Sequence, residues 1–225
     1  MKRIGLIRAA TTSSRSLLHA HGQVLHAAFS SAGVRLSVDS RSIPGQPDGV
    51  HDQESLARAV PRVRALALEL APAVDGILIS CAADPGLPEV REAVSIPVVG
   101  AGSSGAAAAL TLGSRIGVLT ITPEAPAAVS EVLGDHLAAV ESPPSVSTPA
   151  QLLTPTGVFE TLEAGDRLAE AGADVILLAC AGLTSMRAAG ELRRRLGLPV
   201  VDGVLAAGAA LASCSANNPQ PLAVP

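Results

Sequence analysis

The chain has 225 residues, of which 48% are hydrophobic and 16% are charged. This length is enough for one large α/β domain or for two smaller halves with their own cores. With 16 Lys and Arg residues against 20 Asp and Glu residues, the formal net charge is -4. The only aromatic residues are Phe29 and Phe159, so the chain offers neither a basic face that follows phosphates nor a platform for stacked bases. We therefore expect no nucleic-acid partner.

Short apolar runs rich in Val, Ile and Leu alternate with longer segments of helical character, which is typical of βαβ units stacked around a parallel sheet. In chain order, the sequence predicts strands at residues 3–8, 34–39, 75–80, 96–99, 115–121, 137–141, 174–179 and 199–202. It predicts helices at 15–32, 53–71, 85–94, 104–112, 124–134, 157–171, 185–196 and 204–213. The expected fold class is α/β with Rossmann-like parallel sheets.

Two segments could be mistaken for membrane or targeting sequences. Met1–Leu6 is basic and apolar, but Arg8 follows before the apolar core of a signal peptide could form, so we expect a first strand here. Ala93–Ser114 is uncharged and long enough for a membrane span, yet Pro97 and four glycines interrupt it. A strand, a glycine loop and an alanine-rich helix explain it better. We therefore expect a cytoplasmic protein with no membrane partner, and a flexible tail at 215–225.

An internal repeat is the most informative feature of the sequence. Asp75–Cys81 aligns with Asp174–Cys180, and both runs end in a cysteine. The correspondence continues, since Ile96–Gly100 follows the first run and Leu198–Asp202 follows the second. A helix of small residues follows both. The chain therefore consists of two similar α/β units.

The start of each unit sets the expected domain organisation. Arg3–Ile7 corresponds to Arg115–Leu119, and each of these runs opens its unit. We predict a first half at 1–98 and a second half at 99–203, facing each other as two pseudosymmetric domains across a central cleft. The helix at 204–213 is expected to pack back on the first half.

Two of the three cysteines occupy equivalent repeat positions. In a parallel sheet, ligands bind beyond the carboxyl ends of the strands, where Cys81 and Cys180 are expected. A lone cysteine at a strand end is usually a packing residue, but packing does not require the same residue in both repeats. Cys214 has no counterpart and is interpreted as structural. With no CxxC pair or Cys/His cluster, the thiols are expected to be free, as in a cytosolic protein.

Three blocks carry a resemblance to a known family: Ser80-Cys81-Ala82-Ala83-Asp84-Pro85-Gly86-Leu87, Ile96-Pro97-Val98-Val99-Gly100 and Ala179-Cys180-Ala181-Gly182-Leu183. In combination they resemble the hydantoin racemases of the aspartate/glutamate racemase superfamily, over nearly the whole chain. The resemblance implies two pseudosymmetric α/β domains, no cofactor and a small-molecule substrate. It also implies that Cys81 and Cys180 act as acid and base on opposite faces of one carbon. We further expect a homo-oligomer.

The sequence departs from the family pattern at the ends of its strands. Hydantoin racemases typically open with an Asn-Pro-Asn turn after the first strand, where this chain has Arg8-Ala9-Ala10-Thr11-Thr12. Amino-acid racemases of the superfamily usually place Asn-Thr or Thr-His after their cysteines, where this chain has Ala82-Ala83 and Ala181-Gly182. A cyclic or less charged substrate fits these apolar positions better than a free amino acid.

A glycine motif follows the fourth predicted strand. Gly100–Gly105 matches GxGxxG, but it is not at the first strand and Thr120 stands where a ribose-binding acid would be needed, which argues against a dinucleotide site. We expect its backbone N–H groups to hold a substrate oxygen, with two serines as helix caps. Asp84 is interpreted as the N-cap of the next helix, and secondarily as a pocket residue. The predicted substrate-binding set is Arg8, Thr11, Ala82, Ala83, Asp84, Gly102, Ser103, Ser104, Thr120, Thr122, Ala181 and Gly182.

The remaining charged clusters have simpler interpretations. His19, His21 and His26 fall on one predicted helix, where His19 and His26 share a face and His21 does not. We interpret all three as solvated surface residues and expect no metal site. Arg193–Arg195 lies near a helix end, where positive charge complements the helix dipole and needs no ligand.

The sequence therefore favours a cofactor-independent racemase of a 5-substituted hydantoin or related cyclic ureide. One thiolate would remove the proton beside a carbonyl and the opposite thiol would deliver another, with thiol pKa values near the working pH. N–H groups in the turns at 82–84 and 181–183 would stabilise the enolate oxygen. Two alternatives stay open. One is another enzyme of the superfamily, an amino-acid racemase or a maleate-type isomerase. The other is a non-catalytic ligand-binding protein.

Overall fold

A computed structural model describes residues 2–214, so the predicted tail at 215–225 lies outside the described residues. The described part contains eight strands: β1 Lys2–Arg8, β2 Leu36–Ser42, β3 Gly76–Ser80, β4 Val98–Gly100, β5 Ile116–Leu119, β6 Leu137–Glu141, β7 Val175–Leu178 and β8 Val200–Asp202. Its helices are α1 Arg15–Ser31, α2 Gln53–Leu70, α3 Leu87–Ala93, α4 Ala101–Leu110, α5 Ala127–Leu133, α6 Pro155–Glu170, α7 Ala181–Ser185, α8 Ala188–Leu196 and α9 Gly203–Ser213. Single 3-10 turns lie at Ala71–Ala73, Gly134–His136 and Gln151–Leu153.

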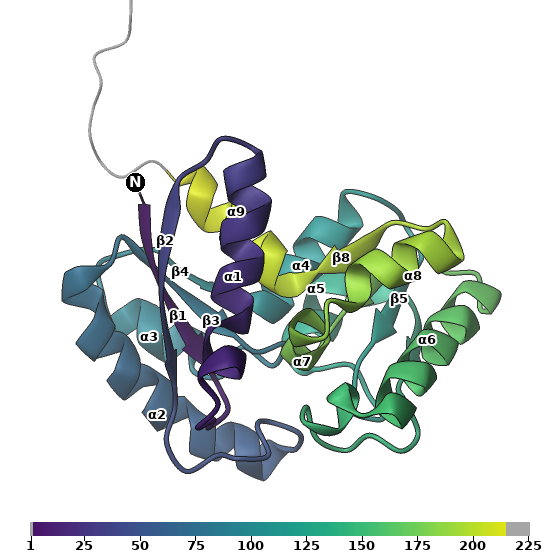
Figure 1. The fold of residues 1–225 in the computed structure, drawn as a ribbon, viewed down its shortest axis with the longest axis horizontal. Coiled ribbons are helices and arrows are strands. Elements are labelled where there is room, and N and C mark those ends of the chain that lie inside the picture. Colours follow the sequence, from purple (N-terminus) through teal and green to yellow (C-terminus); the bar gives the residue numbers. More distant parts are fainter. Residues whose placement is uncertain (1, 215–225) are drawn as a thin grey trace, which may run out of the picture.

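The strands form two four-stranded sheets with the same strand order. The order is β2-β1-β3-β4 in the first sheet and β6-β5-β7-β8 in the second. Every neighbouring pair is parallel. The two sheets lie next to each other with helices around them (Figure 1). The predicted α/β class with two pseudosymmetric parallel sheets is confirmed.

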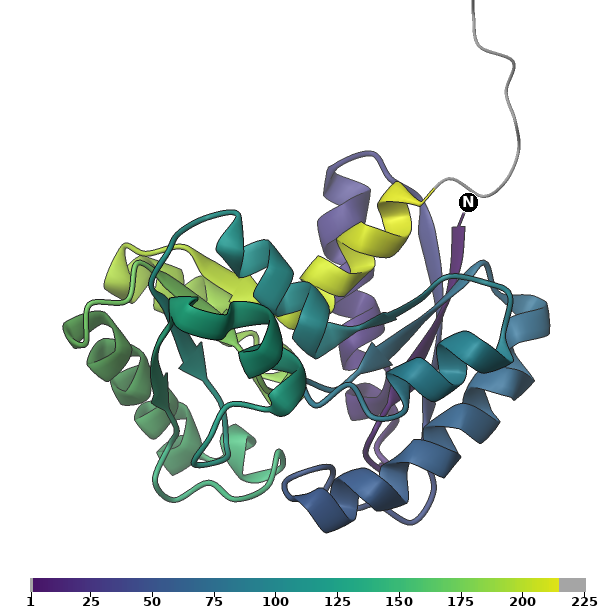
Figure 2. The same ribbon diagram turned by 180° about the vertical axis from the view of Figure 1, so that it is seen from behind.

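Helices cover both faces of each sheet, because the central strands are apolar on both sides. All residues of β3 are buried. On its outer face, the first sheet packs Ile77 and Ile79 against Ala59 and Val63 of α2 and against α3. The second sheet packs against α6 and α8 in the same way. These four helices form the outer layers in Figure 2, while α1 and α5 lie on the opposite faces of their sheets.

The helix after the last strand of each half packs on the sheet of the other half. α4 follows β4 of the first sheet, yet its Ala106 and Ala109 pack with β5 and β7 of the second. α9 follows β8 of the second sheet, yet its Ala207 and Leu211 pack with β1 and β3 of the first. Each half therefore completes the core of the other.

The two exchanged helices also pack directly against each other in the middle of the molecule (Figures 1 and 2). A Cβ atom on Gly105 would lie 2.9 Å from the Cα of Gly203, and one on Gly203 would lie 2.5 Å from the carbonyl oxygen of Ala101. Glycine at both positions permits this close approach.

Two predicted helices need correction. The helix predicted at 104–112 begins at Ala101, directly after β4. The helix predicted at 185–196 is divided into α7 and α8, because Arg187 between them adopts a left-handed conformation with φ of 56°. A left-handed residue cannot continue an α-helix, so the chain turns before α8 begins.

The uncharged segment at 93–114 forms β4, α4 and their connections. α4 has 10 residues, about half of what a membrane span needs. Throughout residues 2–214, no helix combines the length and the apolar character needed to cross a membrane.

Candidate active site

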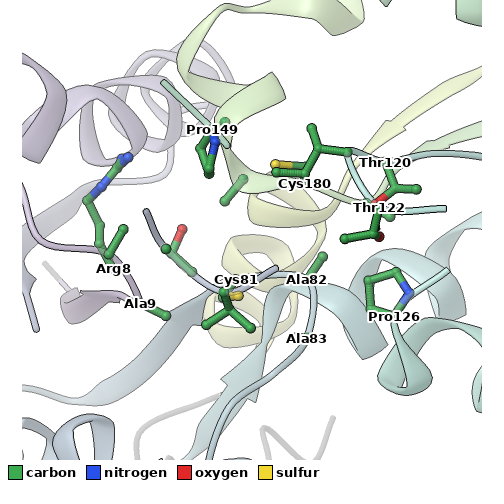
Figure 3. Close-up of a pocket in the computed structure, with 18 residues that line it drawn as sticks. Arg8, Ala9, Cys81, Ala82, Ala83, Thr120, Thr122, Pro126, Pro149 and Cys180 are labelled. Carbon is green, nitrogen blue, oxygen red and sulfur yellow. The ribbon is translucent and has the colours of Figure 1, made fainter. Parts of the chain in front are cut away.

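The carboxyl ends of strands from both sheets meet around one small pocket. β1 and β3 end there in the first sheet, and β5 and β7 end there in the second. The pocket has a volume of about 70 Å³, and Figure 3 shows the sulfur atoms of Cys81 and Cys180 inside it. Its lining residues are Arg8, Ala9, Ala10, Gly49, Val50, Ser80, Cys81, Ala82, Ala83, Thr120, Ile121, Thr122, Pro126, Pro149, Ala179, Cys180, Ala181 and Gly182.

Cys81 directly follows β3 and is half-buried in the pocket. Burial raises the pKa of its thiol to about 12, because the charged thiolate loses its hydration. The backbone N–H of Ala83 acts in the opposite direction, whereas the nearby Asp84 carboxylate raises the pKa further. The Cys81 thiol is therefore protonated at neutral pH.

Cys180 follows β7 and stands at the start of α7, where it is buried. Burial raises the pKa of its thiol to about 11. The backbone N–H groups of Gly182 and Leu183 and the positive charge of Arg8 each lower this pKa. The nearby charges thus act in opposite directions on the two thiols, because Arg8 lowers the pKa of Cys180 whereas Asp84 raises the pKa of Cys81.

One expectation about the cysteine turns needs correction. The thiol pKa values lie well above the neutral range that the sequence predicts. The backbone N–H of Ala83 lowers the pKa of Cys81, and those of Gly182 and Leu183 lower the pKa of Cys180, so these groups favour the thiolate form of each cysteine. The N–H of Leu183 also donates to the carbonyl oxygen of Cys180 at 3.0 Å.

Arg8 is the one charged side chain among the described residues that line the pocket. Its Nη1 donates a hydrogen bond to Nε2 of His21 at 2.8 Å. Its Nε is buried and has no partner within residues 2–214, and none of the ion pairs found there includes Arg8. Burial lowers the pKa of Arg8 to about 10, an effect that Cys180 partly offsets. The guanidinium is therefore a positive charge with unused donors beside the pocket.

His21 is fully buried, which corrects its interpretation as a surface residue. Its Nδ1 lies 2.8 Å from the hydroxyl of Ser80, and its Nε2 lies 2.8 Å from that of Ser185. Burial and the charge of Arg8 hold the pKa of His21 well below its usual value, so the ring is neutral. His21 thus ties together α1, the end of β3 and α7, and holds Arg8 in place.

A signal for the burial of His21 is present in the sequence. Leu18, Leu25 and Phe29 lie three, four and eight residues from His21, on one face of the helix. Of these, Leu25 is fully buried, and His21 belongs to the same apolar stripe. The relative positions of the three histidines on the helix do not by themselves indicate that His21 is buried.

Thr120 and Thr122 line the pocket from the second half. The hydroxyl of Thr122 donates to the carbonyl oxygen of Glu124 at 2.7 Å. The two threonine hydroxyls lie 3.0 Å apart. Because the proton of Thr122 is already used, Thr120 is the donor in this pair.

Asp84 does not cap the helix that follows it, which corrects its predicted role. Gly86, with a φ of 71°, stands at the start of α3. The Asp84 carboxylate instead accepts hydrogen bonds from the backbone N–H groups of Gly102 and Ser103, each at 2.8 Å, and so caps α4. Asp84 itself has a left-handed φ of 47°, and these two bonds offset the strain. The cysteine turn is thereby fastened to α4.

The glycine motif makes room for this contact. A Cβ atom on Gly100 would lie 2.2 Å from Cγ of Asp84, and one on Gly102 would lie 2.0 Å from the carbonyl oxygen of Ala82. The expected substrate contact of Gly102 is therefore replaced by a contact with the turn that carries Cys81. Ser103 and Ser104 lie inside the first turn of α4 and are not its caps.

The structure brings together seven of the twelve predicted substrate-binding residues in the pocket lining: Arg8, Ala82, Ala83, Thr120, Thr122, Ala181 and Gly182. Four other predicted residues do not line the pocket and lie behind the turn that carries Cys81: Asp84, Gly102, Ser103 and Ser104. Thr11 is also absent from the lining. Its hydroxyl donates to the Ile43 carbonyl and accepts from the N–H of Gln46, so it shapes the neighbouring loop.

Sequence analysis did not identify the loops that cover the pocket. Gly49 and Val50 come from the connection between β2 and α2, and Pro149 comes from the connection between β6 and α6. A Cβ atom on Gly49 would contact Pro149 at 3.4 Å, so the two loops touch. These are equivalent loops of the two halves, and the repeat could have indicated them.

A larger cavity of about 530 Å³ adjoins the pocket. The two share Val50, Ala83, Thr122 and Pro126. Among residues 2–214, no three His, Cys, Asp or Glu side chains come close enough together to hold a metal ion.

The family model described as Asp/Glu/Hydantoin racemase matches residues 4–211. The chain belongs to this family. It is 31% identical to a hydantoin racemase of Rhizobium meliloti over 145 residues, which are 60% of this chain and 57% of that protein. It is 34% identical to a hydantoin racemase of Pseudomonas sp. (strain NS671) over 139 residues, 59% of this chain and 55% of that protein. The matched region thus spans somewhat more than half the length of these curated relatives.

The fold is also that of a solved racemase structure. An allantoin racemase from Klebsiella pneumoniae superposes with a TM-score of 0.80 at 24% identity, covering 95% of this chain and 87% of that one. The resemblance to hydantoin racemases drawn from the cysteine blocks is confirmed. The chain is thus a member of a family of racemases. Its two thiols lie at the strand ends, where α/β sheets bind their ligands.

Proposed function

We propose that the protein is a cofactor-independent racemase of 5-substituted hydantoins or closely related cyclic ureides. The observation that carries this proposal is the pair of thiols, Cys81 and Cys180, that enter one small pocket from equivalent positions of the two halves. A base on one side of a carbon and an acid on the other can invert its stereocentre, because the proton leaves one face and another arrives on the opposite face. Membership of the family and the similarity to hydantoin racemases support it.

The reaction uses the two thiols in opposite protonation states. The thiolate of one cysteine takes the proton from the stereocentre, and the electron pair of the broken C–H bond moves onto the adjacent carbonyl oxygen as an enolate. The thiol of the other cysteine then gives its proton to the opposite face of the carbon. The first cysteine ends protonated and the second ends as the thiolate, ready for the reverse direction.

The N–H groups at the cysteine turns supply part of the thiolate stability. They offset the burial that raises the pKa of both thiols. At pH 7 a thiol with a pKa of about 11 is ionised in about one molecule in 10⁴. Both cysteines of the resting enzyme are therefore mostly thiols at pH 7, and Cys180, near Arg8, is the easier of the two to ionise.

The character of the pocket favours a ureide over a free amino acid. An amino acid carries an ammonium group that needs a carboxylate partner, and the pocket lining contains no acidic residue. Its lining is mostly alanine, glycine, proline and valine. The adjoining cavity offers room for the substituent at carbon 5 of the ring, and its lining is mixed, with Leu56 and Pro123 beside the acidic Asp52 and Glu124.

The test is a panel of enantiopure compounds followed by polarimetry. We expect loss of optical rotation with one or more 5-substituted hydantoins or allantoin, without added metal and after exhaustive chelation. Racemisation of aspartate or glutamate alone, or isomerisation of maleate alone, would contradict the substrate class. Recovery of activity by one metal after chelation would contradict the mechanism. Tight binding of a hydantoin without racemisation would identify a ligand-binding protein instead.

A further inference from the structure

The hydrogen-bonding groups of the pocket can be sorted into donors and acceptors. The guanidinium of Arg8 can only donate, so Nε2 of His21, at 2.8 Å, is an acceptor and carries no proton. Because the ring is neutral, its proton is on Nδ1 and is donated to the hydroxyl of Ser80. Ser80 lines the pocket, and its own proton is left to donate elsewhere. The first half of the pocket therefore presents donors.

The second half presents acceptors. The proton of the Thr122 hydroxyl goes to the carbonyl oxygen of Glu124, and the proton of the Thr120 hydroxyl goes to Thr122. Both hydroxyl protons are thus used within the protein, and only oxygen lone pairs of these side chains remain for a ligand. Thr120 is almost fully buried, so a ligand group that met it without a hydrogen bond would be disfavoured.

The two sets lie on opposite sides of the thiols. In Figure 3, Arg8 appears on one side of Cys81 and Cys180, and the two threonines appear on the other. The internal repeat explains the arrangement, because Arg8 at the end of β1 and Thr120 after β5 occupy equivalent positions. The pocket is pseudosymmetric in its thiols and asymmetric in its hydrogen bonds.

We propose that Arg8 and Thr120 determine a single orientation of the ureide ring, with the carbonyl oxygen next to the stereocentre toward Arg8 and Ser80 and the ring N–H toward Thr120 and Thr122. This inference rests on the proposed function. In a hydantoin, the stereocentre at carbon 5 stands between a carbonyl on one side and an N–H on the other. The orientation places that carbon between the two thiols, whichever enantiomer is bound.

Arg8 then stabilises the negative charge of the enolate. The oxygen that it contacts is the one that receives the electron pair when the proton leaves carbon 5. Because its Nε has no partner and the described residues offer it no carboxylate, its charge is available to that oxygen.

The threonine side is tested with a ligand changed by one group. An oxazolidine-2,4-dione has a ring oxygen in place of the N–H beside carbon 5 and is otherwise of the same shape. We expect wild type to prefer the hydantoin over the oxazolidinedione with the same substituent by about 100-fold in kcat/KM, because oxygen would face oxygen lone pairs. Thr120→Val should reduce this ratio to below about 10-fold. Thr120→Ser should retain it.

Thr111→Val, at an exposed position after α4, is the matched control and should leave both substrates unchanged. A structural defect in Thr120→Val would slow both substrates equally and leave the ratio intact. An intact ratio in that variant, or equal rates on the two substrates in wild type, would overturn the threonine assignment even though the protein racemises hydantoins. No racemisation of any hydantoin by wild type would instead overturn the proposed function.

The Arg8 side is tested in a variant that has lost Cys180. Arg8 could act on the substrate oxygen or only on the neighbouring thiol, and Cys180→Ser removes that thiol. In D2O, the remaining Cys81 should exchange the proton of one hydantoin enantiomer. If Arg8 holds the enolate oxygen, adding Arg8→Met slows this exchange by about 100-fold, and Arg8→Lys slows it less. Unchanged exchange in the Arg8→Met/Cys180→Ser protein would show that Arg8 serves Cys180 alone and would overturn the assignment.

Discussion

The two halves of the molecule fasten their cysteine turns to the next helix with the same kind of group, taken from different places in the repeat. In the first half, Asp84 stands three residues after Cys81 and caps the helix beyond β4, where Gly100 makes room for it. In the second half, the carboxylate belongs to the last residue of strand β8. Asp202, at the end of β8, caps α9 itself and accepts a hydrogen bond from Thr184 of α7 at 2.9 Å.

The carboxylate and its partner have thus exchanged places between the halves. Gly100 and Asp202 are equivalent strand ends, and the two carboxylates cannot occupy the first half together, because a side chain at Gly100 would collide with Asp84. The difference teaches that the position of the cap matters less than its presence. A buried carboxylate at this helix end fixes the turn that carries the thiol, and either chain segment can supply it.

The largest effects should follow from breaking the symmetry of the thiols. Cys81→Ser and Cys180→Ser should each lower racemisation by about 10²–10⁴-fold, because a serine hydroxyl is a poor base. Cys214→Ser, at the exposed end of α9, is the control and should be close to wild type. Each single variant should still exchange the proton of one enantiomer in D2O, and the two should prefer opposite enantiomers. NMR of each pure enantiomer in D2O measures this exchange. If both variants exchanged the same enantiomer, the prediction that the two thiols act on opposite faces of the carbon would be wrong.

The pH dependence should distinguish the two thiols, with Cys180 ionising at the lower pH. Each thiolate appears as the pH rises toward its raised pKa, about 11 for Cys180 and about 12 for Cys81. Between pH 7 and 10, exchange should therefore increase about tenfold per pH unit in both single variants. At any one pH in this range, the thiolate fraction should be larger for Cys180 than for Cys81. The rate of alkylation by iodoacetamide gives the two titrations when it is measured in Cys81→Ser/Cys214→Ser and in Cys180→Ser/Cys214→Ser, because the exposed thiol of Cys214 would otherwise react as well. A lower pKa for Cys81 than for Cys180 would contradict the assignment of Cys180 as the more easily ionised thiol.

The exchanged caps predict a moderate loss of stability that a second substitution repairs. Asp84→Ala should lower the free energy of unfolding by about 1–2 kcal/mol, the usual cost of losing a helix cap. Gly100→Asp alone should be more damaging, because the new side chain meets Asp84. The double variant Asp84→Ala/Gly100→Asp copies the second half and should be more stable than either single variant. Urea unfolding measures all three, and a double variant no better than Gly100→Asp would contradict the exchange.

The smallest effect should come from two aspartates that precede the central strands β3 and β7, at the ends of the sheets away from the pocket. Asp174 accepts hydrogen bonds from the N–H groups of Ser114 and Arg115, which lower its pKa, whereas the equivalent Asp75 accepts one from the N–H of Arg3. A depressed pKa means that stability is present above the ordinary carboxyl range and is lost as the pH falls through the folded value. Asp174→Asn should therefore lower the Tm slightly at pH 7 and have no effect near pH 2. Asp75→Asn should lower it less, as calorimetry can show.

Features that depend on local pattern could be predicted from the sequence. The strands were accessible because they are continuous apolar runs, and the thiol pair was accessible because Asp75–Cys81 and Asp174–Cys180 repeat the same pattern. Features that depend on contacts between residues far apart in the sequence could not be predicted. Asp84 precedes a proline like an ordinary helix cap, but its partners at 102 and 103 come from another element. The partner of His21 at Ser185 is likewise far along the chain.

The exchange of α4 and α9 makes this single chain equivalent to a dimer with swapped arms. If the chain were cut after α4, near Leu112, each fragment would keep its own sheet but would carry the helix that belongs on the other. Neither fragment could bury the inner face of its sheet completely, since Leu6 would keep α1 but lose α9, and Val118 would keep α5 but lose α4. The fragments should therefore fold together and recover activity when mixed. A common ancestor of the two halves would have been an obligate pair, with one thiol from each copy.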